Sequence, residues 1–323
     1  MNKIILTVLI LLVLVEIIPY IITILFPDIC YGCTPMGKVV QNLNSRIGFS
    51  YINWYIYTFL IIYFTSCSFT LKNKQLTLFI VLLCILLIYL PVWPLLNTFS
   101  LFLGLCYTNP PFIEKYQSVF PASVDIEKNA TDIINEYNNY PIKPDCIRKT
   151  NPGFGIEKTD SDTNCWRAIY LKKLGIMETS MKEWFPITMG LLTDPQIHNA
   201  FFSILDPEVE IPPHVGYYKG FLRYHLGVVI PNTDSSDLSE KPYITCGGQT
   251  YYWKQGQGVM FDDMYLHNVK NPSNKTRVVL YLDIKRISPN KIINLINDVG
   301  ISLVENSFVL NAFVKNQHQQ NKL

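Results

Sequence analysis

Hydrophobic residues fill three long stretches of the N-terminal third of the chain, and these stretches contain almost no ionisable side chains. Glu16 is the only one within Ile4–Phe26, and the stretches Ile47–Leu71 and Gln75–Ile113 contain none. Because a helix needs roughly 20 apolar residues to cross a bilayer, the first two stretches each predict one transmembrane helix. The third is interrupted by prolines and predicts one span with an interfacial segment, or a short fourth span. We expect about three transmembrane helices within residues 1–106.

A cleaved signal peptide is the other interpretation of the first stretch. Its apolar run is longer than the roughly 7–15 residues of a signal-peptide core, and no small-residue cleavage site follows, so we favour a multi-pass membrane protein. The positive-inside rule favours a cytoplasmic N-terminus. Three spans would then place the C-terminal part in the lumen or outside the cell, and four would place it in the cytoplasm. The sequons at Asn129 and Asn274 are compatible with a lumenal catalytic domain.

Beyond residue 106 the pattern changes to short apolar runs separated by polar turns. Residues 107–164 predict a lead-in of helix and loop, with a capped amphipathic helix over Ser123–Tyr137 and loop over Asn139–Thr163. Residues 165–290 contain short strand-like runs between turns, a pattern typical of a sandwich or barrel. These runs are Trp166–Leu171, Ala200–Leu205, Leu222–Ile230, Tyr243–Cys246, Gly258–Phe261 and Arg277–Ile284. The chain therefore predicts a mainly β domain behind a helical membrane region.

The C-terminal residues 291–323 predict helices and a polar tail. Ser288-Pro289 has the character of a helix start, and Gly300 that of a helix end, after which a second apolar helix could follow. Among the cysteines, Cys146 and Cys165 could pair in an oxidising compartment. Cys30 and Cys33 indicate a local disulfide or two free thiols more than a metal site, because structural zinc needs two further ligands.

Nucleic acid is not an expected partner. The formal net charge of +2 carries no information on this point, but the sequence has no basic patch with interleaved aromatic residues, so we expect no nucleic-acid binding.

The candidate chemistry lies in two histidines and two arginines. His214 and His267 each sit in a short motif with an arginine following, Arg223 and Arg277 respectively. Two imidazoles with open coordination positions are typical of a non-haem Fe(II) oxygenase, and a dicarboxylate cosubstrate needs fixed cationic groups. Two other histidines, His198 and His318, lack such a motif, and we expect them at the surface.

Strand periodicity indicates where these side chains point. Along Leu222–Ile230, Arg223 and His225 share one face while the other face is apolar; along Arg277–Ile284, Arg277 lies opposite a second apolar face. A cation that faces a barrel interior is costly unless it is paired. An anionic ligand in that interior would remove the cost.

From about Trp166 to Pro289 the chain resembles the aspartyl/asparaginyl β-hydroxylase family of 2-oxoglutarate oxygenases. An ordered series of motifs carries this resemblance. It consists of Phe202-Ser-Ile-Leu-Asp-Pro207, Pro213-His-Val-Gly216, Leu222-Arg-Tyr-His-Leu-Gly-Val-Val-Ile-Pro231, Trp253-Lys-Gln-Gly256, Phe261-Asp-Asp263, His267-Asn-Val-Lys-Asn271 and Arg277-Val-Val-Leu-Tyr-Leu-Asp283. The resemblance implies a double-stranded β-helix, which is a cupin-like jelly roll, with flanking helices, Fe(II), 2-oxoglutarate and O2.

The resemblance also implies a role for each site residue. His214 and His267 match the iron ligands. The residues that match the 2-oxoglutarate pocket are Trp166, Ser203, Arg223, His225 and Arg277. Asp263 matches the second residue of an Asp-Asp pair, and either Asp262 or Asp263 is expected to orient His267. Position 216 is glycine where most 2-oxoglutarate oxygenases have a carboxylate ligand; the resembled family also has glycine there.

Three functions are compatible with these observations. The first is a membrane-anchored dioxygenase that hydroxylates Asp or Asn side chains of proteins. The second is a hydroxylase of lipid acyl chains at the membrane. The third is a catalytically silent β-helix scaffold, against which the intact His, Arg and Ser set argues. The substrate is thus a protein or a lipid at the membrane.

Overall fold

The computed structural model describes residues 99–147 and 163–305, apart from positions 101, 105, 108, 215 and 217. The three hydrophobic stretches up to residue 98, the Cys30 and Cys33 pair, and the second C-terminal helix and tail predicted after residue 305 lie outside these residues. Within the described ranges, no helix has the length and apolar character needed to cross a bilayer.

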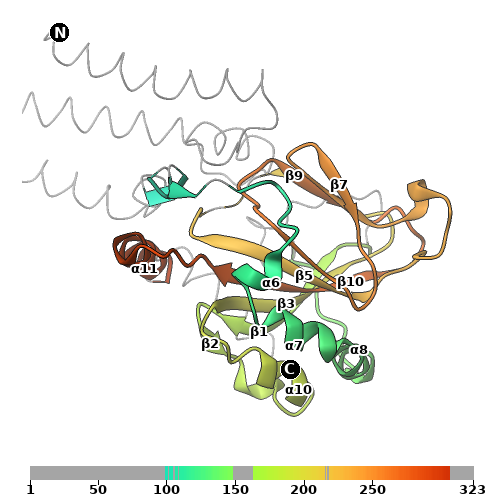
Figure 1. The fold of residues 1–323 in the computed structure, drawn as a ribbon. Coiled ribbons are helices and arrows are strands. Elements are labelled where there is room, and N and C mark those ends of the chain that lie inside the picture. Colours follow the sequence, from blue (N-terminus) through green and yellow to red (C-terminus); the bar gives the residue numbers. More distant parts are fainter. Residues whose placement is uncertain are drawn as a thin grey trace, which may run out of the picture.

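Ten strands lie within the described residues and form the centre of the domain (Figure 1). They are β1 (Trp166–Lys173), β2 (Ile176–Met177), β3 (Ile197–Leu205), β4 (Glu210–His214), β5 (Phe221–Val229), β6 (Tyr243–Cys246), β7 (Gln249–Tyr252), β8 (Gly258–Phe261), β9 (His267–Lys270) and β10 (Arg277–Lys285). The helices are α6 (Tyr116–Val119), α7 (Ser123–Lys128), α8 (Ala130–Asn139), α10 (Pro186–Leu191) and α11 (Lys291–Glu305), with 3-10 turns η2 (Thr179–Met181) and η3 (Leu238–Glu240).

The strands form two antiparallel sheets. A six-stranded sheet has the order β2-β1-β3-β10-β5-β8, and a four-stranded sheet has the order β4-β9-β6-β7. From β3 onward the chain passes back and forth between the sheets, which is the strand order of a jelly roll. The prediction of a mainly β domain with flanking helices is therefore confirmed.

The two faces of the six-stranded sheet have different environments, as the strand periodicity predicts. On the outer face, Leu222, Tyr224 and Leu226 of β5 pack with Leu280 and Leu282 of β10 in a core that α7, α8 and α10 cover (Figure 1). The inner face turns toward the four-stranded sheet, and Trp253 and Val279 belong to the smaller core between the sheets. The polar side chains of β5 and β10 consequently lie inside the jelly roll.

Two helix predictions differ from the structure. The single helix expected over Ser123–Tyr137 is interrupted at Asn129, whose side chain donates to the carbonyl of Asp125 at 2.7 Å; asparagine competes in this way with helical hydrogen bonds. The expected helix end at Gly300 is wrong, because α11 continues to Glu305. A Cβ at Gly300 would overlap the hydroxyl of Tyr218, so this glycine permits close packing and does not end the helix.

Candidate active site

Adjacent strands bring the two candidate metal ligands together. His214 ends β4 and His267 begins β9, and these residues face each other in the antiparallel register, with ring centroids 4.1 Å apart. Each Nδ1 lies against a backbone carbonyl oxygen, that of Pro212 at 2.8 Å for His214 and that of Tyr265 at 3.0 Å for His267. A neutral imidazole that donates from Nδ1 keeps the lone pair of Nε2 for a metal ion.

Burial keeps both imidazoles neutral. Loss of hydration, with the charge of the neighbouring ring, lowers the pKa of His214 to about 3. Loss of hydration lowers the pKa of His267 to about 4, and its carbonyl contact only partly opposes this. Metal binding requires unprotonated imidazole, so the pair is ready to bind at neutral pH. The backbone carbonyl of Tyr265 orients His267 through Nδ1. The expectation that the side chain of Asp262 or Asp263 does so is not met in the described part of the chain.

Asp263 occupies the space that a side chain at position 216 would need. A Cβ at Gly216 would overlap the Asp263 carboxylate, and the Gly216 N–H donates to the Asp263 carbonyl at 2.7 Å. Asp263 Oδ2 pairs with Arg223 Nη2 at 2.8 Å, while Oδ1 has no hydrogen-bond partner in the described part of the chain. Burial raises the pKa of Asp263 despite Arg223. A carboxylate thus lies next to the position where other oxygenases have their acidic ligand.

Arg223 already has two anionic partners. Its guanidinium pairs with Asp263 and also with Asp283 of β10. Nearby, Asp262 pairs with both Lys219 and Arg286, each at 2.6 Å. These six residues, all nearly inaccessible to solvent, combine three cations with three anions. Arg223 therefore positions Asp263 in this structure, and its expected role as a cosubstrate ligand stays a prediction.

Arg277, in contrast to Arg223, has no anionic partner among the described residues. Its side chain is 1% exposed, and none of the ion pairs in the described ranges includes it. Its Nη1 donates to the Ser203 carbonyl at 3.2 Å and lies 3.5 Å from Ser203 Oγ, while Nε has no partner among the described residues. Burial lowers the pKa of Arg277 to about 9, so it stays charged at neutral pH. This uncompensated cation calls for an anionic ligand.

Three further side chains line the space beside Arg277. Trp166 Nε1 donates to Ser203 Oγ at 3.0 Å, and the ring of Trp253 lies 4.6 Å from the Arg277 guanidinium carbon. His225, 5% exposed, stacks on Trp253, and neither of its ring nitrogens has a partner in the described ranges. Burial and the two arginines lower the pKa of His225 well below its usual value. The expected pocket residues thus converge on one region.

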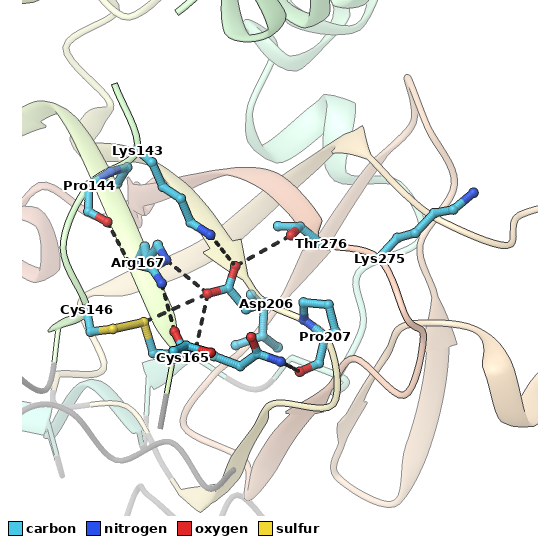
Figure 2. A network of polar contacts seen from close by, with 12 residues as sticks. Lys143, Pro144, Cys146, Cys165, Arg167, Asp206, Pro207, Lys275 and Thr276 are labelled. Carbon is cyan, nitrogen blue, oxygen red and sulfur yellow. Dashed lines mark hydrogen bonds and ion pairs between the residues drawn. A yellow bond between two sulfur atoms is a disulfide. The ribbon is translucent and has the colours of Figure 1, made fainter. Parts of the chain in front are cut away.

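A polar network holds the strand ends that carry this pocket (Figure 2). Asp206, directly after β3, accepts from Arg167 Nε at 2.9 Å and from the backbone N–H of Cys165 at 3.2 Å. Thr276, directly before Arg277, donates to the same carboxylate at 3.5 Å. Cys146 and Cys165 form the disulfide that the sequence left open. The network ties together the start of β1 at Trp166, the end of β3 two residues beyond Ser203, and the start of β10 at Arg277.

The sequence motifs did not identify all of the buried charges. Lys219 and Arg286 lie outside every quoted motif, and only their shared contact with Asp262 reveals them. His198, which we expected at the surface, is 7% exposed and stacks on Phe221, so this prediction is wrong. The apolar run that begins at Ala200, two residues after His198, was the signal available.

Comparison with known proteins gives the chain its relatives. Residues 127–287 match the family described as "Aspartyl/Asparaginyl beta-hydroxylase". An ornithine lipid ester-linked acyl 2-hydroxylase from Rhizobium tropici is 30% identical over 189 residues, which are 58% of this chain and 65% of the relative. The human aspartyl/asparaginyl beta-hydroxylase is 32% identical over 105 residues, which are 32% of this chain and 12% of the relative. The chain thus spans less than two thirds of each of these relatives.

Among solved structures, a viral collagen prolyl hydroxylase from Paramecium bursaria Chlorella virus 1 is similar to half of this chain. The match has 11% identity and a TM-score of 0.28, and it covers 50% of this chain and 91% of the other. A TM-score this low does not establish a shared fold.

Proposed function

The chain belongs to the aspartyl/asparaginyl β-hydroxylase family, and on that premise we propose that it is a membrane-anchored hydroxylase that uses Fe(II), 2-oxoglutarate and O2. The observation that carries the proposal is Arg277, a buried cation without a counter-ion among the described residues; His225 is near both Arg277 and His267, which belongs to a pair of neutral imidazoles. A scaffold would gain nothing from such a residue, because an unpaired buried charge destabilises the fold.

The residues present fit an iron ion. His214 and His267 would hold Fe(II) through Nε2, and Asp263 would accept a hydrogen bond from a water at the position that Gly216 leaves without a ligand. Arg223 holds the Asp263 carboxylate in place. Bound iron with 2-oxoglutarate and O2 supplies the oxidising chemistry that converts a substrate C–H into C–OH, with release of succinate and carbon dioxide.

The chain's own residues would bind and orient the cosubstrate. Arg277 and the Ser203 hydroxyl would hold the distal carboxylate of 2-oxoglutarate, since this arrangement removes the unpaired charge. Trp166 supports Ser203 from β1. His225 and Trp253 would line the cosubstrate and exclude water from it. The six buried charged residues around Asp262 and Arg223 are already paired with one another, so they would keep their geometry when the ligand binds.

We favour a lipid acyl chain as the substrate. The relative from Rhizobium tropici, whose name assigns it to a lipid ester-linked acyl chain, aligns over 58% of this chain, whereas the human protein hydroxylase aligns over 32%. The long uncharged stretches before residue 99 would place the catalytic domain beside a bilayer. Asp or Asn side chains of proteins are the second candidate, favoured by the 32% identity to the human enzyme.

Succinate formation tests the proposal. The full chain would be reconstituted in phospholipid vesicles with Fe(II), and 2-oxoglutarate turnover would be followed with an acyl lipid or with an Asp-containing peptide. We expect turnover coupled to the lipid, and none in the His214→Ala, His267→Ala variant. His318→Ala serves as the matched control, because it removes an imidazole outside any motif. Coupling to the peptide alone would shift the substrate to proteins. If the wild-type protein binds neither Fe(II) nor 2-oxoglutarate, the proposal that it is a hydroxylase is refuted.

A further inference from the structure

Helix α11 is apolar on two faces. Its inner face contributes Ile293, Ile296 and Ile301 to a core with Tyr218 and Phe221. Its outer face presents Ile292, Leu295 and Val299, which are 67%, 62% and 44% exposed. Positions 292, 295 and 299 follow helical spacing and form one continuous stripe. Single exposed aliphatic residues are ordinary, whereas a contiguous apolar patch marks an interaction site.

The inner face of α11 packs against the C-terminal end of the third uncharged stretch. Phe99, Leu103 and Tyr107 belong to the same core as Ile293 and Ile301. These residues belong to the stretch Gln75–Ile113, whose earlier part predicts a transmembrane segment. Figure 1 places α11 and the short helical turn near residue 103 on one side of the sheets, away from α7, α8 and α10. The outer stripe is thus presented next to the point where the chain would leave a bilayer.

The same helix is fastened to the loop between the two motifs of the active site. The Tyr218 hydroxyl donates to Asn297 Oδ1 at 3.0 Å, and Asn297 Nδ2 donates to the Gly220 carbonyl at 3.2 Å. Tyr218 and Gly220 follow His214 and precede Arg223 in the chain. Helix α11 is therefore hydrogen-bonded to the segment that joins His214 to Arg223.

One exposed lysine beside the stripe, Lys291, suits a lipid surface, and the neighbouring pair of Lys285 and Asp298 has no net charge. Lys291 is exposed at the start of α11, and Lys285 pairs with Asp298 across the end of β10. Interfacial helices combine an apolar stripe with flanking basic residues, which approach lipid headgroups while the stripe enters the acyl boundary. A bilayer that holds the earlier part of the stretch Gln75–Ile113 would lie beside the stripe, whereas a protein partner would need no such continuity.

We propose that Ile292, Leu295 and Val299 insert into the bilayer surface, so that α11 lies along the membrane and presents the active site to lipid acyl chains. The inference rests on the proposed function, because it supplies the route by which a lipid substrate reaches the site.

Photo-crosslinking in the full chain tests the proposal. A benzophenone amino acid would replace Leu295 in protein reconstituted in phosphatidylcholine and phosphatidylglycerol vesicles, and adducts would be identified by mass. Leu238 is the matched control, since it is a 53% exposed leucine on the 3-10 turn η3. We expect severalfold more phospholipid adduct at position 295 than at position 238.

Three outcomes would overturn the inference. They are equal lipid labelling at the two positions, a crosslink from position 295 to another segment of the same chain, and a crosslink to a second copy. Succinate formation by the same variants separates this inference from the proposed function. Turnover without a lipid adduct rejects only the role of α11, and a lipid adduct in a protein that never consumes 2-oxoglutarate rejects only the hydroxylase.

Discussion

Replacing Arg277 with methionine should stabilise the ligand-free protein and remove its response to 2-oxoglutarate. Burial lowers the pKa of Arg277 from its ordinary value to about 9, which corresponds to a cost of about 5 kcal/mol for keeping the charge at about 1.36 kcal/mol per pKa unit. Below pH 9 both the folded and the unfolded states are protonated, so the full cost is present at pH 7. Methionine is apolar, similar in length, and avoids this cost.

The net gain will be smaller than the desolvation cost. The variant loses the contacts of Arg277 with Ser203 and with the Trp253 ring, and buried ionic groups replaced by apolar ones typically stabilise by about 1–4 kcal/mol. We expect a melting temperature several degrees above that of the wild type, given about 2–4 °C per kcal/mol for a domain of this size. The measurement is thermal unfolding of the full chain in detergent at pH 7.

Ligand response gives the second half of the experiment. At a 2-oxoglutarate concentration about 100 times its Kd, the wild type should gain about 2.7 kcal/mol, and the variant should gain nothing. Arg167→Met is the matched control: its guanidinium pairs with Asp206 and donates to two carbonyls, so its loss should destabilise by about 3–5 kcal/mol. If Arg277→Met melts at or below the wild-type temperature, or still responds to 2-oxoglutarate, Arg277 is not an unpaired cation that awaits the cosubstrate.

Three further predictions concern the site and its surroundings. Ser203→Ala should raise the KM for 2-oxoglutarate about 5-fold with little change in kcat, since one hydrogen bond is worth about 1 kcal/mol; an unchanged KM in steady-state kinetics would contradict this. Gly216→Asp should abolish Co(II) binding, because the new side chain would overlap the Asp263 carboxylate. Adding Asp263→Ala should restore binding in a spectroscopic titration. A double variant that still fails to bind Co(II) would reject the proposed overlap. Burial lowers the pKa of His198 to about 4, so the folded state binds fewer protons than the unfolded state between about pH 4 and 6.5, and stability falls as the pH drops through that window. His198→Phe should reduce the loss between pH 7 and 5 by about 2 kcal/mol, and an identical loss in both proteins would show that His198 does not contribute.

Local patterns determined much of what the structure contains. The alternation along β5 and β10 predicted which side chains face the interior, because successive residues of a strand point to opposite faces. All six strand-like runs are strands, and two of them, Tyr243–Cys246 and Gly258–Phe261, match to the residue. The motif order also predicted that His214, His267, Ser203 and Arg277 share one site.

Other elements were not predicted from the sequence because their local signals are weak or misleading. Strand β4 contains two prolines, which normally argue against a strand, and Val269 is the only aliphatic residue of β9. Gly300 has the character of a helix end, yet contact with Tyr218 requires a glycine inside the helix. In each case a tertiary contact overrides the local preference.

Tertiary structure alone decided how the charges are shared. Sequence periodicity places Arg223 and Arg277 on interior faces alike, but strand register puts Arg223 opposite Asp283 and Phe261, next to the turn that carries Asp263, and puts Arg277 opposite Leu205. One arginine is therefore neutralised by two carboxylates and the other by none in the described part of the chain. The reason is physical: periodicity fixes the direction of a side chain, whereas its partner depends on residues that only long-range strand pairing brings within reach.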